Sequence, residues 1–166
     1  MDDRLRDTES AELSMYTKGQ LGENEGSGAQ QALKAGVEIL DHLMRSHGFV
    51  YTSTSAGVGS GGSFASGEFH RGDRTLELHF RYSLGLVTYH VGHLALSHED
   101  YMWSIMGRRW GTQYPGFSTD PLDGFRQLLM DLKEHCTDFL VGSDADFAAN
   151  VERAEALKRF TPRLPS

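Results

Sequence analysis

A strict alternation of apolar and polar residues over residues 74–82 restricts the fold more than any other feature of the sequence. Four apolar side chains, from Leu76 to Tyr82, would lie on one side of an extended chain, with polar side chains on the other. This period of two is that of a half-buried β-strand. Most connections between the expected strands are of turn length, which is typical of an antiparallel meander, and a glycine-rich loop is expected at 55–63. The other strands are expected at 49–54, 64–71, 86–91 and 93–96.

Helical periodicity brackets this block on both sides. Before it, four apolar residues recur at spacings of four and three in a predicted helix from about Gln30 to His47, which Gly48 ends. Each of the later helices also carries an apolar stripe, so each is expected to bury one side. These later helices are one capped by Ser97, one that begins with Asp120 as its N-cap and ends at Gly142, and one capped by Ser143.

Strands gathered in one block and helices in others indicate an α+β fold rather than an α/β fold. We predict an antiparallel sheet of four to five strands with helices packed on one face, in the order helix, β-meander, helices. The other face would carry the polar half of each strand, and a functional surface is expected there.

Residues 1–27 differ in composition from the rest of the chain. They contain seven acidic and three basic residues and end in a glycine-rich stretch. We expect an acidic, flexible N-terminal segment there, followed by a single domain at 28–166. The alternative is a segment that docks on its own domain or on a partner through Leu13, Met15, Tyr16 and Leu21.

The chain is acidic, with 23 Asp and Glu against 16 Lys and Arg and a formal net charge of −7. This balance argues against binding to nucleic acids or to anionic membranes, which need positive charge at the contact. No stretch is apolar over the length of a bilayer, and the N-terminal residues lack the apolar core of a secretory signal. The single cysteine, Cys136, lies on a predicted apolar stripe and is expected to be buried rather than reactive. The expected compartment is the cytoplasm.

The stretch Gly57–Gly62 matches the spacing G-x-G-x-x-G of a dinucleotide-binding loop. In such a site the glycines open a helix after a strand, whereas a strand is expected to follow here. A kinase-type glycine loop needs a lysine on a downstream strand, and no lysine occurs between Ser46 and Lys133. We therefore expect a flexible hairpin loop, with a flap over the open sheet face as the alternative.

Five of the eight histidines are clustered in the strand region. His79 and His90 are expected on the polar face with Glu77 and Arg81, and a turn near Leu84 would bring the two histidines close together. We expect solvent-facing or hydrogen-bonded imidazoles, no metal and no cofactor, because Arg81 would oppose a cation. The alternative is a ligand-binding face in which a histidine acts as a base and Arg81 anchors an anion.

An aromatic-rich segment between two predicted helices is the best candidate for a partner-binding site. Its residue types are those that dominate interface hot spots. The alternative is a loop whose aromatic side chains fold back on the core. The candidate partner-binding residues are Arg108, Arg109, Trp110, Tyr114 and Phe117.

The predicted function is a non-enzymatic protein-interaction module, of the kind to which acidic inhibitors and immunity-type proteins belong. Acidity speeds association with a basic protein partner. The stretch from Leu76 to Leu140 is similar in style to small bacterial α+β proteins, a class that includes immunity proteins, and the similarity assigns no residues. Two alternatives are kept: a small-molecule- or metal-binding enzyme that uses the polar face, and a homo-oligomer paired through an edge strand.

Overall fold

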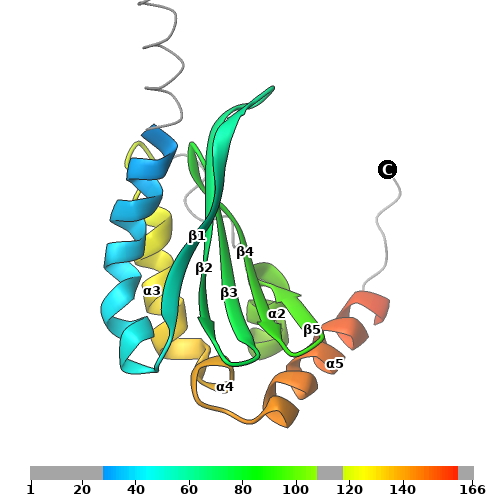
Figure 1. Ribbon diagram of the computed structural model, residues 1–166. Coiled ribbons are helices and arrows are strands. Elements are labelled where there is room, and N and C mark those ends of the chain that lie inside the picture. The colour runs from blue at the N-terminus through cyan, green and yellow to red at the C-terminus, as the bar shows by residue number, and fades with distance from the viewer. Residues whose placement is uncertain (1–27, 108–117, 161–166) are drawn as a thin grey trace, which may run out of the picture.

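The computed structural model describes residues 28–107 and 118–160, and Figure 1 shows a single sheet with helices before and after it. The five strands are antiparallel and lie in the order β1-β2-β3-β4-β5, so the predicted α+β meander is confirmed. The elements are α1 (residues 28–46), β1 (Val50–Gly59), β2 (Gly62–Arg71), β3 (Arg74–Arg81), β4 (Ser83–Val91), β5 (Leu94–Ser97), α2 (His98–Met106), α3 (Asp123–His135), α4 (Thr137–Leu140) and α5 (Asp144–Phe160).

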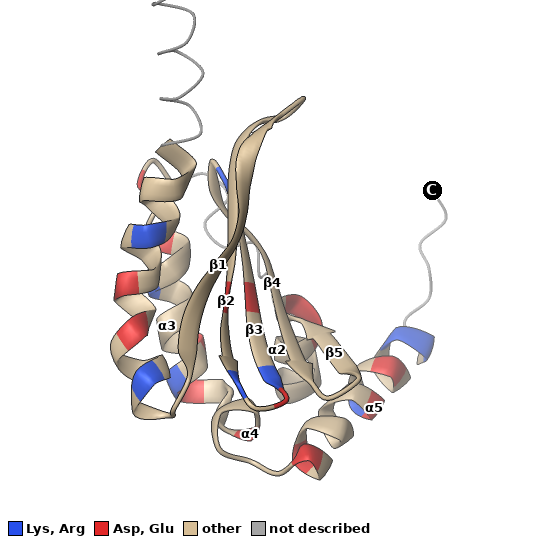
Figure 2. Ribbon diagram, in the orientation of Figure 1, with Lys and Arg blue, Asp and Glu red and all other residues tan. Residues whose placement is uncertain are grey.

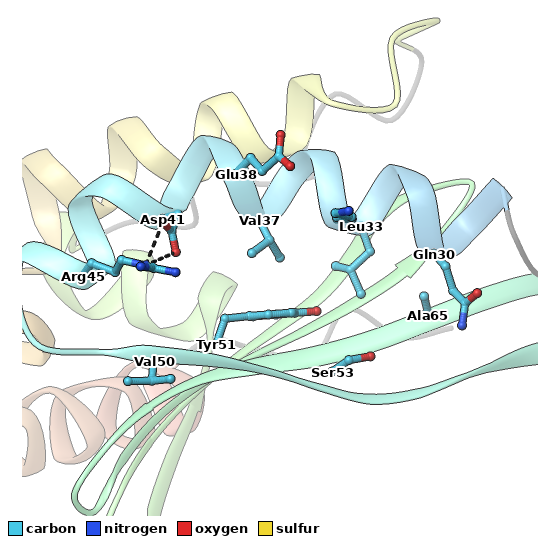
Figure 3. Close-up of a pocket in the computed structure, with 11 residues that line it drawn as sticks. Gln30, Leu33, Val37, Glu38, Asp41, Arg45, Val50, Tyr51, Ser53 and Ala65 are labelled. Atoms are coloured by element: carbon cyan, nitrogen blue, oxygen red, sulfur yellow. Dashed lines mark hydrogen bonds and ion pairs between the residues drawn. The ribbon is translucent and has the colours of Figure 1, made fainter.

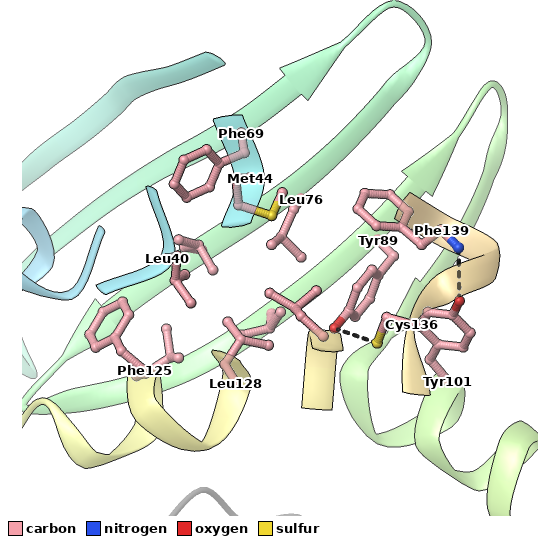
Figure 4. Close-up of a cluster of buried hydrophobic side chains, with 14 of the residues drawn as sticks. Leu40, Met44, Phe69, Leu76, Tyr89, Tyr101, Phe125, Leu128, Cys136 and Phe139 are labelled. Carbon is pink, nitrogen blue, oxygen red and sulfur yellow. Dashed lines mark hydrogen bonds between the residues drawn. The ribbon is translucent and has the colours of Figure 1, made fainter. Parts of the chain in front are cut away.

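The core lies between one face of the sheet and the helices. Every second residue of β3 is buried, as its alternation predicts. Phe80 of β3 stacks on Phe125 of α3 with ring centroids 6.1 Å apart, and Tyr89 of β4 meets Tyr101 of α2 edge-on at 4.8 Å (Figure 4). These large rings join sheet and helices into one apolar layer, and no described helix covers the opposite face of the sheet.

Three predicted helix ends are confirmed by their hydrogen bonds or backbone angles. Gly48 follows α1 with a φ of +82°, a left-handed conformation that glycine adopts without strain. The Ser97 side chain accepts a hydrogen bond from the backbone amide of Asp100 at 3.2 Å, and Ser143 accepts one from Asp146 at the same distance. The Asp146 carboxylate accepts in return from the Ser143 amide at 2.8 Å, which completes a capping box at the start of α5.

The prediction of a loop at 55–63 is wrong, because β1 and β2 run through this stretch and turn at Ser60 and Gly61. A Cβ at Gly61 would overlap the guanidinium of Arg81, and one at Gly62 would overlap the hydroxyl of Tyr82. The glycines therefore make room for large side chains that lie across a β-hairpin, as aromatic residues do beside glycines in other sheets.

The helix predicted from Asp120 begins three residues later and is interrupted. The Asp120 carboxylate accepts from the backbone amide of Leu122 at 2.9 Å, so it closes a turn ahead of α3 rather than capping the helix. At Cys136 the backbone leaves the helical region, with φ −102° and ψ 28°, and α4 follows as a separate short helix. The apolar stripe continues through this break, since Cys136 and Phe139 are both fully buried.

Helices α1 and α3 approach each other closely at a glycine. Gly36 is buried in the middle of α1, and a Cβ there would overlap the ring of Phe125 in α3. The missing side chain lets the aromatic ring lie directly on the α1 backbone, which brings both helices onto the same part of the sheet.

Replacing Gly36 with alanine is expected to destabilise the protein, although alanine normally favours a helix over glycine by about 1 kcal/mol. The added methyl group would force Phe125 aside, and overpacking of this kind costs about 1–3 kcal/mol. Denaturant unfolding of Gly36→Ala measures the change in the free energy of unfolding. Gly28→Ala is the control, because nothing lies within 4 Å of a Cβ at Gly28. Equal stability of both variants and wild type would contradict the helix contact.

Candidate functional site

The four residues predicted for the polar face of the sheet do lie on one uncovered face. Glu77, His79 and Arg81 alternate along β3 with buried residues, and His90 lies on the same side of β4. No described helix packs over this side in Figure 1. We call it the open face.

The structure does not bring His79 and His90 together, so that expectation is wrong. The chain turns at Tyr82, whose φ is +63°, and Arg81 pairs directly with Ser83. His79 consequently faces Leu86, while His90 faces Thr75 four residues along β3. A left-handed conformation at a tyrosine is uncommon, which is why the turn was expected farther along the chain.

His79 is held by its neighbours on β2. Its Nδ1 lies 2.7 Å from the hydroxyl of Ser66, and its ring stacks on Phe64 at 6.0 Å. The guanidinium of Arg81 lies 5.8 Å from the centre of the same Phe64 ring. His79 and Arg81 therefore share a structural contact at the base of the β1–β2 hairpin.

The centre of the open face is acidic. His90 Nε2 is 3.1 Å from a carboxylate oxygen of Glu77, and Glu77 lies directly across from Glu68 of β2. Among the described residues Glu68 has no ion-pair partner, and Figure 2 shows this acidic centre on the middle strands. Two carboxylates in directly opposed positions repel each other, and this repulsion makes the site attractive to a cation or a cationic side chain.

Residues 28–107 and 118–160 contain neither a metal-binding cluster nor a membrane-spanning helix. Within these ranges no three His, Cys, Asp or Glu side chains are grouped as they would be to hold a metal ion. Within the same ranges no helix is both long and apolar enough to cross a bilayer. The five candidate partner-binding residues, Arg108, Arg109, Trp110, Tyr114 and Phe117, lie outside the described residues.

A buried polar chain that sequence reasoning missed links β4, α2 and α3. The Tyr89 hydroxyl lies 2.8 Å from His98 Nδ1, and His98 Nε2 lies 2.9 Å from the Asp131 carboxylate. Gln127 donates to the second oxygen of Asp131 at 3.0 Å, and the Tyr89 hydroxyl is 3.6 Å from the Cys136 sulfur.

The order hydroxyl, imidazole, carboxylate resembles that of a catalytic triad, but a substrate cannot reach it. Tyr89 has no exposed surface, and His98 and Asp131 are also buried. A neutral imidazole that donates to Asp131 can accept from Tyr89, so the three groups satisfy one another. This chain fastens the sheet to two helices, and His98 is buried rather than a surface residue of the helix start.

A second buried polar group, the guanidinium of Arg74, connects the sheet to the segment between α4 and α5. Arg74, at the start of β3, donates to the carbonyl oxygens of Phe139 at 2.5 Å and Gly142 at 2.7 Å, and pairs with Asp144 at 3.0 Å. These carbonyls lie at the end of α4, where no further helical amide reaches them. Arg74 therefore ties α4 and the start of α5 to the sheet.

A groove of about 540 Å³ separates α1 from the first strand of the sheet. Figure 3 shows Leu33 and Val37 of α1 above Tyr51 of β1, with polar side chains along the rim. The Asp41 and Arg45 side chains pair with each other at 2.8 Å on this rim. The groove adjoins the outer edge of β1 and is independent of the open face.

Asp131→Ala is expected to lower the free energy of unfolding by about 3 kcal/mol, because it removes the buried carboxylate that lies 2.9 Å from Nε2 of buried His98. Denaturant unfolding measures the loss. Glu134→Ala, in the same helix but exposed, is the control and is expected to change stability by less than about 0.5 kcal/mol. Similar effects of the two substitutions would contradict a structural role for the buried chain.

Cys136 is expected to be unreactive in the folded protein. Burial raises the pKa of its thiol, and the nearby carboxylates of Asp131 and Asp138 raise it further, so the nucleophilic thiolate does not form at neutral pH. An aromatic disulfide reagent should release no coloured thiolate from native protein at pH 8 and one equivalent after unfolding in guanidinium. Rapid reaction of the native protein would show that the thiol is accessible.

Comparison with known proteins gives no relative for this chain. No protein-family model, curated protein or solved structure matches it. The open face, the groove and the chemistry of the residues on them are therefore the features that bear on function.

Proposed function

We propose that this chain is a non-enzymatic protein-interaction module that binds a protein with a cationic, Lys- or Arg-rich surface through the open face. The observation that carries the proposal is the directly opposed pair of carboxylates, Glu68 and Glu77, at the centre of an uncovered sheet face. A cationic side chain placed between them would relieve their mutual repulsion, so binding would gain more there than at an isolated acid.

An apolar side chain beside the acidic centre supports the same function. Leu86, across from His79 on the same face of the sheet, is 68% exposed. Apolar and aromatic side chains next to complementary charge are the usual composition of a protein interface. The net charge of −7 would add long-range attraction for a basic partner.

The aromatic and arginine residues between α2 and α3 stay a second candidate contact. Arg108, Arg109, Trp110, Tyr114 and Phe117 are expected to contribute hot-spot side chains to the same partner. An acidic inhibitor or immunity-type protein of the cytoplasm would combine these features. It would use charge for fast association and aromatic anchors for slow dissociation.

An acid–base enzyme is the second candidate function, and one contact favours it. His90 Nε2 lies 3.1 Å from a carboxylate oxygen of Glu77, an arrangement found where a carboxylate orients a histidine base. Arg81 would then anchor an anionic substrate, but its guanidinium lies over Phe64, on the far side of His79 from this pair. The open face therefore favours binding over catalysis.

The double variant Glu68→Gln/Glu77→Gln is expected to lose the partner, because it removes both central charges with little change in shape. Tagged full-length protein is used to capture partners from native lysate at low and at physiological salt, and mass spectrometry identifies them. Wild type is expected to hold one stoichiometric basic protein more strongly at low salt.

The matched control is Glu134→Gln/Glu152→Gln, which makes the same change in net charge on exposed helix positions. With the captured protein purified, we expect the open-face variant to associate about 10-fold more slowly at low salt and the control to be unchanged. Equal rates for both variants would contradict binding at the open face.

A further inference from the structure

Among the described residues, no strand pairs with the outer edge of β1. This strand is ten residues long, reads VYTSTSAGVG, and contains no charged residue and no proline. Natural proteins guard exposed edges with charge, proline, shortness or a β-bulge, because unpaired amides and carbonyls recruit other strands. Of these features β1 has only the bulge, between Ser53 and Ser55. The opposite edge is guarded, since β5 has only four residues and leads directly into α2.

Helix α1 does not cover this edge. The groove of about 540 Å³ lies between α1 and β1, and Leu33, Val37 and Tyr51 form its apolar lining (Figure 3). The ring of Tyr51 rests on Phe69 at 5.2 Å and lies over Gly67, so it is fixed in place. A strand added to β1 would find hydrogen-bonding groups on the edge and an apolar wall beside it.

We propose that the strand that occupies this edge is β1 of a second copy of this chain, paired antiparallel across a two-fold axis perpendicular to the sheet. Such a dimer forms one continuous sheet of ten strands. A two-fold axis makes the pairing antiparallel without any connecting segment, which suits an isologous interface. The inference does not depend on the proposed function.

The chain's own residues 1–27 fit this edge less well. They join α1 at the Gln30 end of the groove, whereas β1 begins at its Arg45 end (Figure 3). A segment that reached β1 directly from there would run parallel to it, so α1 would be a crossover connection. With the open face toward the reader, β1 is the left edge and the helices lie behind, which makes that crossover left-handed. About 98% of such crossovers are right-handed.

An irregularity in β1 indicates which of its residues would pair with the second copy. The pairing of β1 with β2 shifts between Ser53 and Ser55, which marks a bulge, so residues 50–53 form the regular run beside the groove. Opposed residues in an antiparallel pair share a face, so either Tyr51 or Thr52 lies on the two-fold axis. No charge meets its own copy in either register, since neither residue is charged.

Sedimentation of the full chain over about 1–100 µM tests the dimer, a range that brackets micromolar association. Wild type is expected to shift with concentration toward twice the 18.5 kDa chain mass. Thr52→Lys is expected to raise the dissociation constant of the dimer at least 10-fold, because it places two ammonium groups near the axis. Within one copy the new lysine would face Glu68, so the monomer should tolerate it.

Thr88→Lys is the matched control, because it also places a lysine across from a glutamate, Glu77, but on a central strand. Amide exchange of wild type at low and high concentration gives a second readout, with greater protection of residues 50–53 expected at high concentration. A monomer at every concentration, or a dimer weakened equally by both substitutions, would overturn the proposal. In the monomeric case the edge would be left to a segment of another protein.

Discussion

Tyr89 links the sheet to three helices through its ring and its hydroxyl. Its ring lies at the meeting point of sheet and helices, edge-on to Tyr101 of α2 at 4.8 Å and to Phe139 of α4 at 5.0 Å. Its hydroxyl begins the buried chain through His98 to Asp131 of α3. One side chain of β4 thus makes ring contacts with α2 and α4 and begins a hydrogen-bonded chain to α3. A fully buried tyrosine is stable only where its hydroxyl finds such a partner.

The sequence predicts the layers of this fold better than its connections. The alternation along β3 and the serine caps of α2 and α5 depend on neighbours within four residues, and these were predicted correctly. The sequence predicts a loop at 55–63, where the structure has a hairpin, because glycine has no strand propensity of its own. Its strands are stabilised by Arg81 and Tyr82, some twenty residues away, and no local pattern reports that contact.

In the candidate site, the sequence predicts which face of the sheet each residue lies on, but not which residues lie opposite each other. The alternation of side chains along a strand predicts that Glu77, His79 and Arg81 lie on one face, because every second residue points to the same side. The register between β3 and β4 decides which side chains lie opposite each other. This register depends on a left-handed turn at Tyr82, which the amino-acid types in this stretch do not predict. The buried role of His98 was missed for a related reason, since its partners lie 9 and 33 residues away.

The proposed dimer and the proposed partner site together would account for the distribution of charge over the sheet. In a strand that pairs with its own copy, a charged residue near the axis meets the same charge, so β1 must be free of charge. No such limit applies to β2 and β3, which carry Glu68 and Glu77. An axis perpendicular to the sheet turns both open faces the same way, so a dimer presents two acidic centres on one surface. A partner with repeated cationic sites would then bind both centres and gain avidity that neither copy offers alone.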